Sequence, residues 1–239
     1  MTLRAVYVDL DDTLLGRGAS LLHDGDGAFS LLGARALEAC ARAGAEVVAV
    51  SGRRRALVEE DARLLGLRAY AFEAGAGLAV DGELEWLAGG PDTHAHTAAS
   101  GALELLLAHF PGLAVDPHND EREVTHLLRG EADPEAADAL LEAHGHGHLR
   151  LLDNGASFHL LPRGASKAFA VARHQQIRGL APSDTIAIGD SREDLGMAAV
   201  VGTYWAVANG VGAPDARRTE ESYGAGVYEA VLTTLAERR

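Results

Sequence analysis

The 239-residue sequence predicts an α/β protein, a doubly wound parallel sheet into which a second, smaller α+β domain is inserted. Two observations lead to this fold class. Short apolar runs alternate with helix-period stretches toward both ends of the chain, which is the rhythm of a parallel sheet with helices on both faces. In the middle, the pattern changes to helices separated by pairs of strands. We therefore expect a core formed by residues 1–82 and 163–239, and an inserted domain formed by residues 83–162.

The elements of the core follow from apolar runs and amphipathic stretches. Before the insertion, the pattern predicts strands 3–9, 46–50 and 68–72 and helices 30–43 and 54–65. A hairpin of strands 77–80 and 83–86, joined by Asp81 and Gly82, leads from the core into the insertion. After the insertion, the pattern predicts helix 166–178, strand 184–189, helix 192–200, strand 203–207 and helix 226–237.

The insertion has its own α-β-β-α-β-β pattern. The expected elements are helix 97–109, strands 112–116 and 122–129, helix 134–143, and strands 148–153 and 156–161. The last two strands are separated by Asn154 and Gly155, and an Asn-Gly step is the strongest short-range signal for a hairpin. Such a unit is too small to be very stable alone, so we expect it to lie over the core as a lid.

Two carboxylates mark the end of the first strand. Asp9 and Asp11 follow the apolar residues 5–8, and residues two apart in an extended chain point the same way. Like charges side by side are tolerable with a cation between them or a shared proton. One carboxylate could then attack while the other moves protons. Taken alone, this Asp-x-Asp-x-Thr pattern is equally typical of an ordinary turn after a strand.

Three further polar motifs, in the same order along the chain, favour chemistry over a simple turn. Ser51 and Gly52 end the second strand and could offer a hydroxyl and a backbone N–H to an anion. Lys167 lies in the first turn of a helix, where the helix dipole disfavours a cation unless an anion is near. Asp190 and Asp194 follow the strand at 184–189. Because the carboxyl ends of strands meet in one crevice of a doubly wound sheet, we expect these motifs to converge.

These four motifs resemble those of the haloacid dehalogenase-like hydrolase superfamily, and specifically its phosphatases. Asp9 and Asp11 match the first motif and Ser51 the second, while Lys167 matches the third and Asp190 with Asp194 the fourth. The resemblance covers the whole chain. It implies a Rossmann-like core with a C2-type cap, as in the branch of sugar-phosphate and phosphoglycolate phosphatases.

The resemblance implies hydrolysis of a small phosphorylated metabolite through an aspartyl-phosphate intermediate. In that reaction Asp9 is the nucleophile, and Asp11 is the general acid and base. Ser51, Gly52 and Lys167 hold the phosphoryl oxygens.

The resemblance also implies Mg²⁺, because a carboxylate and a phosphate dianion repel each other without a hard cation. Its ligands would be Asp9, the backbone carbonyl of Asp11, and Asp190. Asp194 would orient Lys167 or take part in the metal site, although a helix first-turn carboxylate would also suit that position.

Three positions depart from the usual pattern of the superfamily. Asp12 stands where glycine is common, and Ser51 replaces a more usual threonine while keeping the hydroxyl. Glu193 stands where many relatives carry an asparagine that donates to the phosphoryl group, and a carboxylate there would repel phosphate. We expect Glu193 to face solvent, because a first-turn glutamate is stabilised by the helix dipole.

Other candidates for substrate contact are weaker. His159 and Arg163 lie on or beside the last strand of the insertion, and Arg53 follows Gly52. Surface positions would account for these three residues equally well. Nine of the eleven histidines lie in the insertion, and we interpret the run at 144–148 as exposed histidines, because no cysteine or regular carboxylate accompanies it.

Composition narrows the classes of partner. The net charge of −14 argues against nucleic acid and anionic membranes. No apolar stretch approaches the roughly 20 residues of a membrane-spanning helix, and the chain enters a strand without a basic, apolar leader. The single cysteine, Cys40, can form no internal disulfide, which favours a buried thiol in a cytoplasmic protein. The oligomeric state stays open.

Two alternative functions also stay open. The first is phosphotransfer to a second sugar, as in enzymes resembling phosphomannomutase, which would require a bisphosphate activator. The second is a catalytically weak regulator that binds sugar phosphates; Glu193 favours it, whereas the intact Asp9 and Asp11 argue against it. A dehalogenase is disfavoured, because the departure of halide needs no acid such as Asp11.

Overall fold

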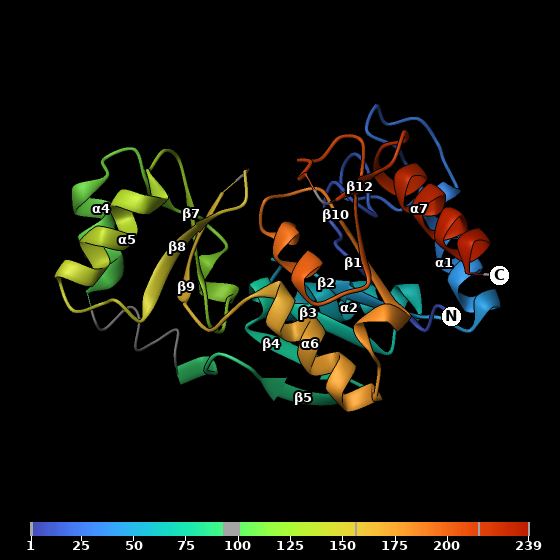
Figure 1. Cartoon of the computed structure of the whole chain (residues 1–239). Helices are drawn as coiled ribbons and strands as arrows, with labels where there is room; N and C mark the ends of the chain where they lie inside the picture. Colours follow the sequence, from blue (N-terminus) through green and yellow to red (C-terminus); the bar gives the residue numbers. More distant parts are fainter. Residues whose placement is uncertain (1, 93–100, 156, 215, 239) are drawn as a thin grey trace.

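The computed structural model describes residues 2–92, 101–155, 157–214 and 216–238. Its strands form two separate sheets, one in each of the two lobes visible in Figure 1. The larger sheet consists, from edge to edge, of β12 (Arg217–Arg218), β11 (Thr203–Ala206), β10 (Thr185–Gly189), β1 (Ala5–Val8), β2 (Glu46–Val50), β3 (Ala69–Phe72), β4 (Gly77–Val80) and β5 (Glu83–Trp86).

The centre of the larger sheet is parallel and buried. β1 pairs in parallel with β10 on one side and with β2 on the other, and each of its four residues is buried. A strand that is covered on both faces is expected to be apolar throughout, as Ala5–Val8 is. Antiparallel pairing in the described sheet is confined to one edge, where β4 pairs with β3 on one side and with β5 on the other.

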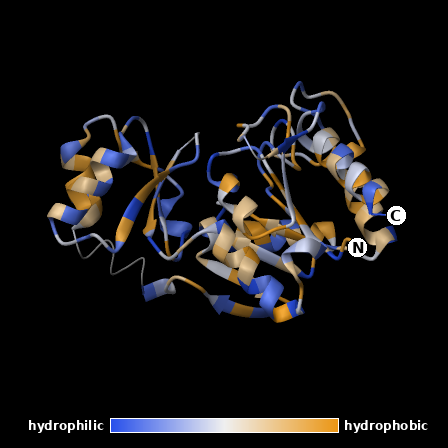
Figure 2. Cartoon of the chain, in the orientation of Figure 1, coloured by the Kyte–Doolittle hydropathy of each residue, from blue (hydrophilic) through white to orange (hydrophobic). Residues whose placement is uncertain are grey.

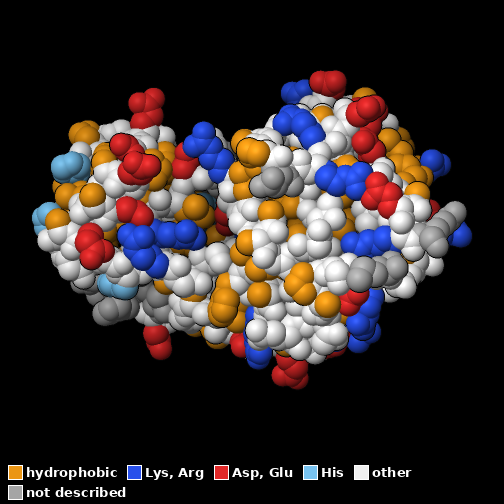
Figure 3. All heavy atoms as spheres, in the orientation of Figure 1, with side chains coloured by type: hydrophobic (Ala, Val, Ile, Leu, Met, Phe, Trp, Pro, Cys, Tyr) orange, Lys and Arg blue, Asp and Glu red, His pale blue; other side chains and the backbone are white. Residues whose placement is uncertain are grey.

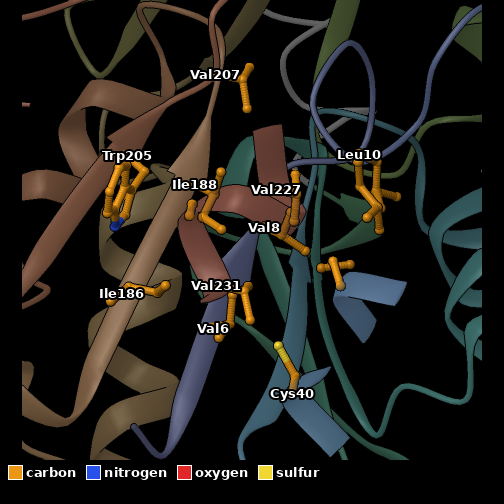
Figure 4. Packing of buried hydrophobic residues seen from close by; sticks show 14 of the residues in the cluster. Val6, Val8, Leu10, Cys40, Ile186, Ile188, Trp205, Val207, Val227 and Val231 are labelled. Atoms are coloured by element: carbon orange, nitrogen blue, oxygen red, sulfur yellow. The ribbon is translucent and has the colours of Figure 1, made fainter. Parts of the chain in front are cut away.

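Two helices cover one face of this sheet. α1 (Leu32–Ala43) and α7 (Tyr223–Glu237) contact each other, and both contribute to one hydrophobic cluster with the central strands. Figure 4 shows Val8 of β1 and Ile188 of β10 beside Val227 of α7. α2 (Arg55–Leu65) adds its buried Val58 to the same cluster.

The opposite face is covered by α6 (Lys167–Arg178) and by η4 (Asp194–Ala199), a 3-10 helix. Val171 of α6 and Met197 of η4 are buried against Tyr7 in a second cluster. In Figure 2 the strands of the larger sheet are mostly hydrophobic, whereas the helices carry both hydrophobic and hydrophilic residues. The larger lobe is therefore a three-layer α/β structure, which is the predicted fold class.

The smaller lobe is an antiparallel sheet with helices on one side, on the left in Figure 1. Leu106, Leu128, Leu141 and Leu160 are fully buried in its separate core. Its sheet and helices are β6 (Ala114–Val115), β7 (His126–Arg129), β9 (Phe158–Pro162), β8 (Leu149–Asp153), α4 (Ala102–His109) and α5 (Pro134–Ala143).

Most predicted boundaries differ from the observed ones by only a few residues. The predicted helix 192–200 is instead a turn followed by η4. The predicted strand 122–129 begins only at His126, because the 3-10 helix η2 (Asn119–Glu121) and a loop that contacts the larger lobe precede it. The two-residue edge strand β12 was not predicted. Residues 97–100 of the helix expected at 97–109, together with His94 and His96, lie outside the described residues.

Two smaller expectations concern Cys40 and membranes. Cys40 is a buried free thiol in the cluster under α1, and burial raises its pKa to about 12. Among the described residues, no helix combines the length and the apolar character needed to cross a membrane.

Candidate active site

A cavity of about 380 Å³ lies where the carboxyl ends of β1, β2 and β10 face the smaller lobe. The larger lobe lines it with Asp9, Asp11, Asp12, Ser51, Gly52, Arg53, Lys167, Asp190, Ser191 and Glu193. The smaller lobe lines it with Arg122, Leu127, Arg129, Asn154, Ser157 and His159. All four sequence motifs therefore converge on one cavity, apart from Asp194, which lies buried beneath it.

The side chain of Asp9, at the end of β1, is buried in the cavity. It is only 8% exposed, and its Oδ1 accepts a hydrogen bond of 2.7 Å from Nζ of Lys167. Burial raises the pKa of Asp9 well above its ordinary value, even though Lys167 acts in the opposite direction. Asp194 and Asp190 raise that pKa further, because they add negative charge nearby.

Lys167 is held at the start of α6 by its neighbour. The side chain of Ser166 caps the helix by accepting from the N–H of Phe169, so that Lys167 is the first helical residue. Its ammonium group, 3% exposed, donates to Asp9 and to Asp194, each at 2.7 Å. Burial would lower the pKa of Lys167, but the two carboxylates outweigh it and raise that pKa well above its ordinary value. The ammonium is therefore a permanent positive charge.

Asp194 is fully buried and ties the fourth motif together. Its Oδ2 accepts from the hydroxyl of Ser191 at 2.6 Å and from the N–H of Ser191 at 3.0 Å. Its side chain lies against Gly189, where a Cβ would come within 2.4 Å of the Cβ of Asp194, so this strand must end in glycine. Thr13 donates to Asp190 at 2.7 Å.

The three aspartates fit a hard divalent cation. Carboxylate oxygens of Asp9, Asp190 and Asp194 lie within 4.8 Å of one another, and they form the only such group among the described residues. Burial and the charge of Asp194 raise the pKa of Asp190 to about 6, although Thr13 acts against this. The group therefore brings three carboxylates together, and oxygen donors of this kind suit Mg²⁺.

Asp11 lies at the rim of the cavity rather than beside Asp9. Its side chain is 53% exposed and accepts two hydrogen bonds from the guanidinium of Arg53, at 2.6 and 2.7 Å. Arg53 also donates to Asp61 at 2.5 Å. The guanidinium of Arg53, a candidate for substrate contact, is therefore already paired with two carboxylates. Asp12 adopts a left-handed backbone with φ of 57°, a conformation open to glycine and tolerated by aspartate. This explains how aspartate can stand at the position where glycine is common.

Ser51 and Gly52 form the wall next to Asp11. Ser51 is buried, and its Oγ accepts from the N–H of Arg53 at 3.1 Å. The carbonyl of Gly52 accepts from Arg122 of the smaller lobe at 3.0 Å. A Cβ on Gly52 would lie 3.5 Å from His159, so the imidazole borders this wall directly.

Glu193 does not face solvent, so that expectation is wrong. Its side chain is only 6% exposed, and its Oε2 lies 3.9 Å from Nζ of Lys167. Burial raises the pKa of Glu193. The expectation assumed the first turn of an α-helix, whereas the chain forms a turn here and directs the side chain inward before η4 begins. Its Oε1 has no hydrogen-bond partner among the described residues.

Of the two candidates for substrate contact on the insertion, His159 lies in the cavity and Arg163 lies outside it. His159 is 2% exposed and lines the cavity. Burial lowers the pKa of His159 well below its ordinary value, and the cations Arg122 and Lys167 act in the same direction, so the ring is neutral. Arg163 instead is 45% exposed and binds Asp138 at 3.2 Å and the carbonyl of Gly147 at 2.7 Å. It lies outside the cavity, because its place at the end of β9 directs it toward α5.

The histidine run at 144–148 lies on the far side of the smaller lobe. His144 and His148 are exposed, and pale-blue histidine atoms gather on the outer edge of this lobe in Figure 3.

The sequence analysis did not predict that Arg122 and Arg129 line the cavity. They are the first and last residues of the strand predicted at 122–129, and no pattern in that polar segment marked either of them as a cavity residue.

A buried carboxylate joins the two lobes. Glu73, fully buried after β3, accepts hydrogen bonds from the N–H groups of Glu123, Val124 and Thr125 at 2.8, 3.0 and 2.7 Å. It also accepts from the hydroxyl of Thr125 at 3.0 Å. Arg55 adds a two-pronged ion pair with Glu123 at 2.7 and 3.1 Å. These contacts hold the loop at 122–125 against the larger lobe.

Comparison with known proteins shows which families this chain is similar to. Residues 119–213 match the family described as haloacid dehalogenase-like hydrolase. A phosphoglycolate phosphatase from Methanoculleus marisnigri is 39% identical over 103 residues, which cover 41% of this chain and 43% of the relative. A phosphoglycolate phosphatase from Methanococcoides burtonii is 26% identical over 241 residues, 99% of this chain and 98% of the relative. The chain spans only 43–52% of the length of several curated relatives that it matches.

The solved structures agree on the fold. The sucrose-phosphatase from Synechocystis sp. PCC6803, solved in complex with sucrose and phosphate, superimposes with a TM-score of 0.72 at 18% identity. The superposition covers 98% of each chain. It therefore includes both lobes.

Proposed function

We propose that the chain is a member of the haloacid dehalogenase-like hydrolase superfamily and a Mg²⁺-dependent phosphatase, which hydrolyses a small phosphorylated metabolite through an aspartyl phosphate. The observation that carries this proposal is the group of Asp9, Lys167, Asp190 and Asp194 at the strand ends, where two buried carboxylates accept hydrogen bonds from one ammonium group. The roles of the individual residues are inferred from the chemistry of phosphoryl transfer.

Asp9 would act as the nucleophile. Its carboxylate attacks phosphorus, the bond from phosphorus to the ester oxygen breaks, and Asp11 protonates the departing alcohol. Water then attacks the phosphorus of the acyl phosphate while Asp11 accepts its proton, which releases inorganic phosphate and restores Asp9. Lys167 and the hydroxyl of Ser51, together with the N–H of Gly52, would hold the phosphoryl oxygens as charge spreads over them.

The metal would be held by Asp9, Asp190 and the backbone carbonyl of Asp11, with Asp194 beside them. When bound, Mg²⁺ supplies positive charge that offsets the repulsion between the carboxylate and the phosphate dianion. Asp194 has a second task, because it fixes Nζ of Lys167 at 2.7 Å.

The proposed substrate is small. The cavity holds about 380 Å³, and the smaller lobe, which lies within the proposed insertion of residues 83–162, would close over it as a cap. The relatives named phosphoglycolate phosphatase suggest phosphoglycolate as the first compound to test, and the sucrose-phosphatase suggests sugar phosphates as the second class. The proposal keeps the cytoplasmic setting that the single cysteine favours.

The test is a phosphate-release assay with Mg²⁺ across phosphoglycolate, sugar phosphates and a folded phosphoprotein. We expect turnover of a small ester, loss of turnover with a chelator, and labelling of Asp9 by phosphate in mass spectrometry. A requirement for a bisphosphate activator would instead indicate phosphotransfer. Binding without any turnover would indicate a regulator.

A further inference from the structure

Arg122 is a buried cation with no carboxylate partner. Its side chain belongs to the smaller lobe, lines the cavity and is only 8% exposed. Among the described residues it forms no ion pair, and it donates hydrogen bonds to the hydroxyl of Thr125 at 2.7 Å and to the carbonyl of Gly52 at 3.0 Å. Burial lowers the pKa of Arg122, which marks the cost of keeping it charged there. A buried charge held only by neutral groups favours binding of an anion.

The two walls of the cavity carry opposite charges. The wall from the larger lobe contains five carboxylates besides its cations, whereas the wall from the smaller lobe contains Arg122 and Arg129 and no acidic residue among its lining side chains. Arg129 is 62% exposed and already paired with Asp116, so Arg122 is the one of the two without a carboxylate. An anion on the distal end of the substrate would therefore meet Arg122, while the phosphoryl end meets Lys167.

A relay of hydrogen bonds fixes the position of Arg122. The hydroxyl of Thr125 donates to Glu73 at 3.0 Å, which leaves its lone pairs facing Nη1 of Arg122 at 2.7 Å. Glu73 itself is fully buried, with a left-handed backbone at φ of 47°, a conformation that glutamate adopts only when its surroundings impose it. The larger lobe thus orients a side chain of the smaller lobe through Thr125.

We propose that Arg122 is a specificity-determining residue that binds a carboxylate on the leaving group, and that Glu73, acting through Thr125, is its positioning residue. This inference rests on the phosphatase function proposed above. A guanidinium has five N–H donors in a planar fork that matches a carboxylate. Its contacts to Gly52 and Thr125 use two of these donors, and the others can bind the carboxylate of a substrate. The substrate class is then the phosphate monoesters of small hydroxy acids.

The direct test compares phosphoglycolate with its neutral amide as substrates in the presence of Mg²⁺. We expect Arg122→Gln to lower kcat/KM for phosphoglycolate by at least about tenfold, the effect of losing a hydrogen bond to a charged group, and to change kcat/KM for the amide little. Arg163→Gln is the matched control, because Arg163 lies on the same lobe outside the cavity, and both values should stay unchanged.

The relay has its own test. Thr125→Val removes the hydroxyl and keeps the shape, so KM for phosphoglycolate should rise several-fold with kcat little changed, while Thr125→Ser should restore the wild-type KM. Glu73→Gln should raise the same KM. Thermal unfolding of each variant shows whether it is folded, and a purely structural role would move both substrates together.

Four outcomes would overturn the inference. An equal loss on both substrates in Arg122→Gln would place Arg122 on the phosphoryl group, and no loss on either would make it structural. If the wild-type protein hydrolyses both substrates equally well, only this inference fails. If it hydrolyses no phosphate ester, the proposed function fails and the inference fails with it.

Discussion

Two sets of buried acids in this protein differ in how their charges are satisfied. Glu73, at the junction of the lobes, accepts four hydrogen bonds from one loop. In the cavity, Asp9 is buried and Asp190 is half-buried, and each accepts a hydrogen bond from one side chain, Lys167 and Thr13 respectively. The pKa values of both aspartates are raised, chiefly by burial. The difference indicates that Glu73 serves stability, whereas the aspartates retain capacity for a ligand.

Of the variants that test this comparison, we expect Asp9→Asn to have the largest effect, a loss of activity. An amide of nearly the same shape is a poor nucleophile, so kcat should fall by about 10³-fold or more. Thermal unfolding should occur at the same or a higher temperature, because the variant removes a buried charge. Activity near the wild-type level in protein free of contaminating phosphatase would contradict the role of Asp9.

The second effect concerns Lys167, the counter-charge of the cluster. Lys167→Met leaves Asp9 and Asp194 buried without their cation, and breaking a buried pair in this way costs about 3–5 kcal/mol of unfolding free energy. Chemical denaturation in a metal-free buffer measures it. We expect added Mg²⁺ to recover part of the loss. Unchanged stability without metal would show that the cluster does not depend on this charge.

The third effect concerns Glu73, whose carboxylate accepts four hydrogen bonds. In Glu73→Gln the side chain keeps one acceptor oxygen and gains donors that face N–H groups, so the protein should lose about 1–3 kcal/mol of stability. Thermal and chemical unfolding measure the loss. Glu60→Gln, an exposed position on α2, is the control and should change nothing. A variant as stable as the wild type would remove the contrast between the two sets of acids.

The fourth effect concerns Glu193, which borders the cavity with an unpartnered oxygen. Glu193→Asn replaces a carboxylate that would repel the phosphoryl group with a possible donor. Inhibition by inorganic phosphate should strengthen several-fold, since a charge-assisted hydrogen bond is worth about 1.5–3 kcal/mol. Glu38→Gln on the exposed surface of α1 serves as the control. A clear loss of activity would mean that the Glu193 carboxylate has a task of its own.

The smallest effect lies far from the cavity, at Glu46. Burial acts against its ionisation, but hydrogen bonds to His174 and Arg178 outweigh it and lower its pKa from 4.5 to about 2. A lowered pKa in the folded state means that the stabilisation is complete above the ordinary value and is lost as pH falls from about 4.5 to about 2.

Glu46→Gln should therefore be less stable than the wild type at pH 7, by under about 1 kcal/mol for a pair that is partly exposed. The difference should shrink as pH falls toward 2. Unfolding temperatures across that range measure it. A difference independent of pH would indicate lost packing instead of lost charge.

The sequence by itself determined the core elements and the convergence of the motifs. An apolar strand such as Ala5–Val8 can be buried only in a sheet covered on both faces, so its order with the neighbouring helices already implied a parallel core. Polar residues at the carboxyl ends of such strands meet by topology. Asp9, Lys167 and Asp190 could therefore be assigned to one place before any coordinates, because local pattern and topology were sufficient.

Only the tertiary structure decided which side chains of the smaller lobe reach the cavity. Arg122 and Arg163 look alike in sequence, yet a loop bound by Glu73 directs the first into the cavity, and the end of β9 directs the second toward Asp138. Glu193 turned inward because a turn replaced the expected α-helix. The direction of Arg122 depends on contacts between residues 50 or more positions apart, those of Glu73 with residues 123–125, and periodicity within a segment carries no record of such contacts.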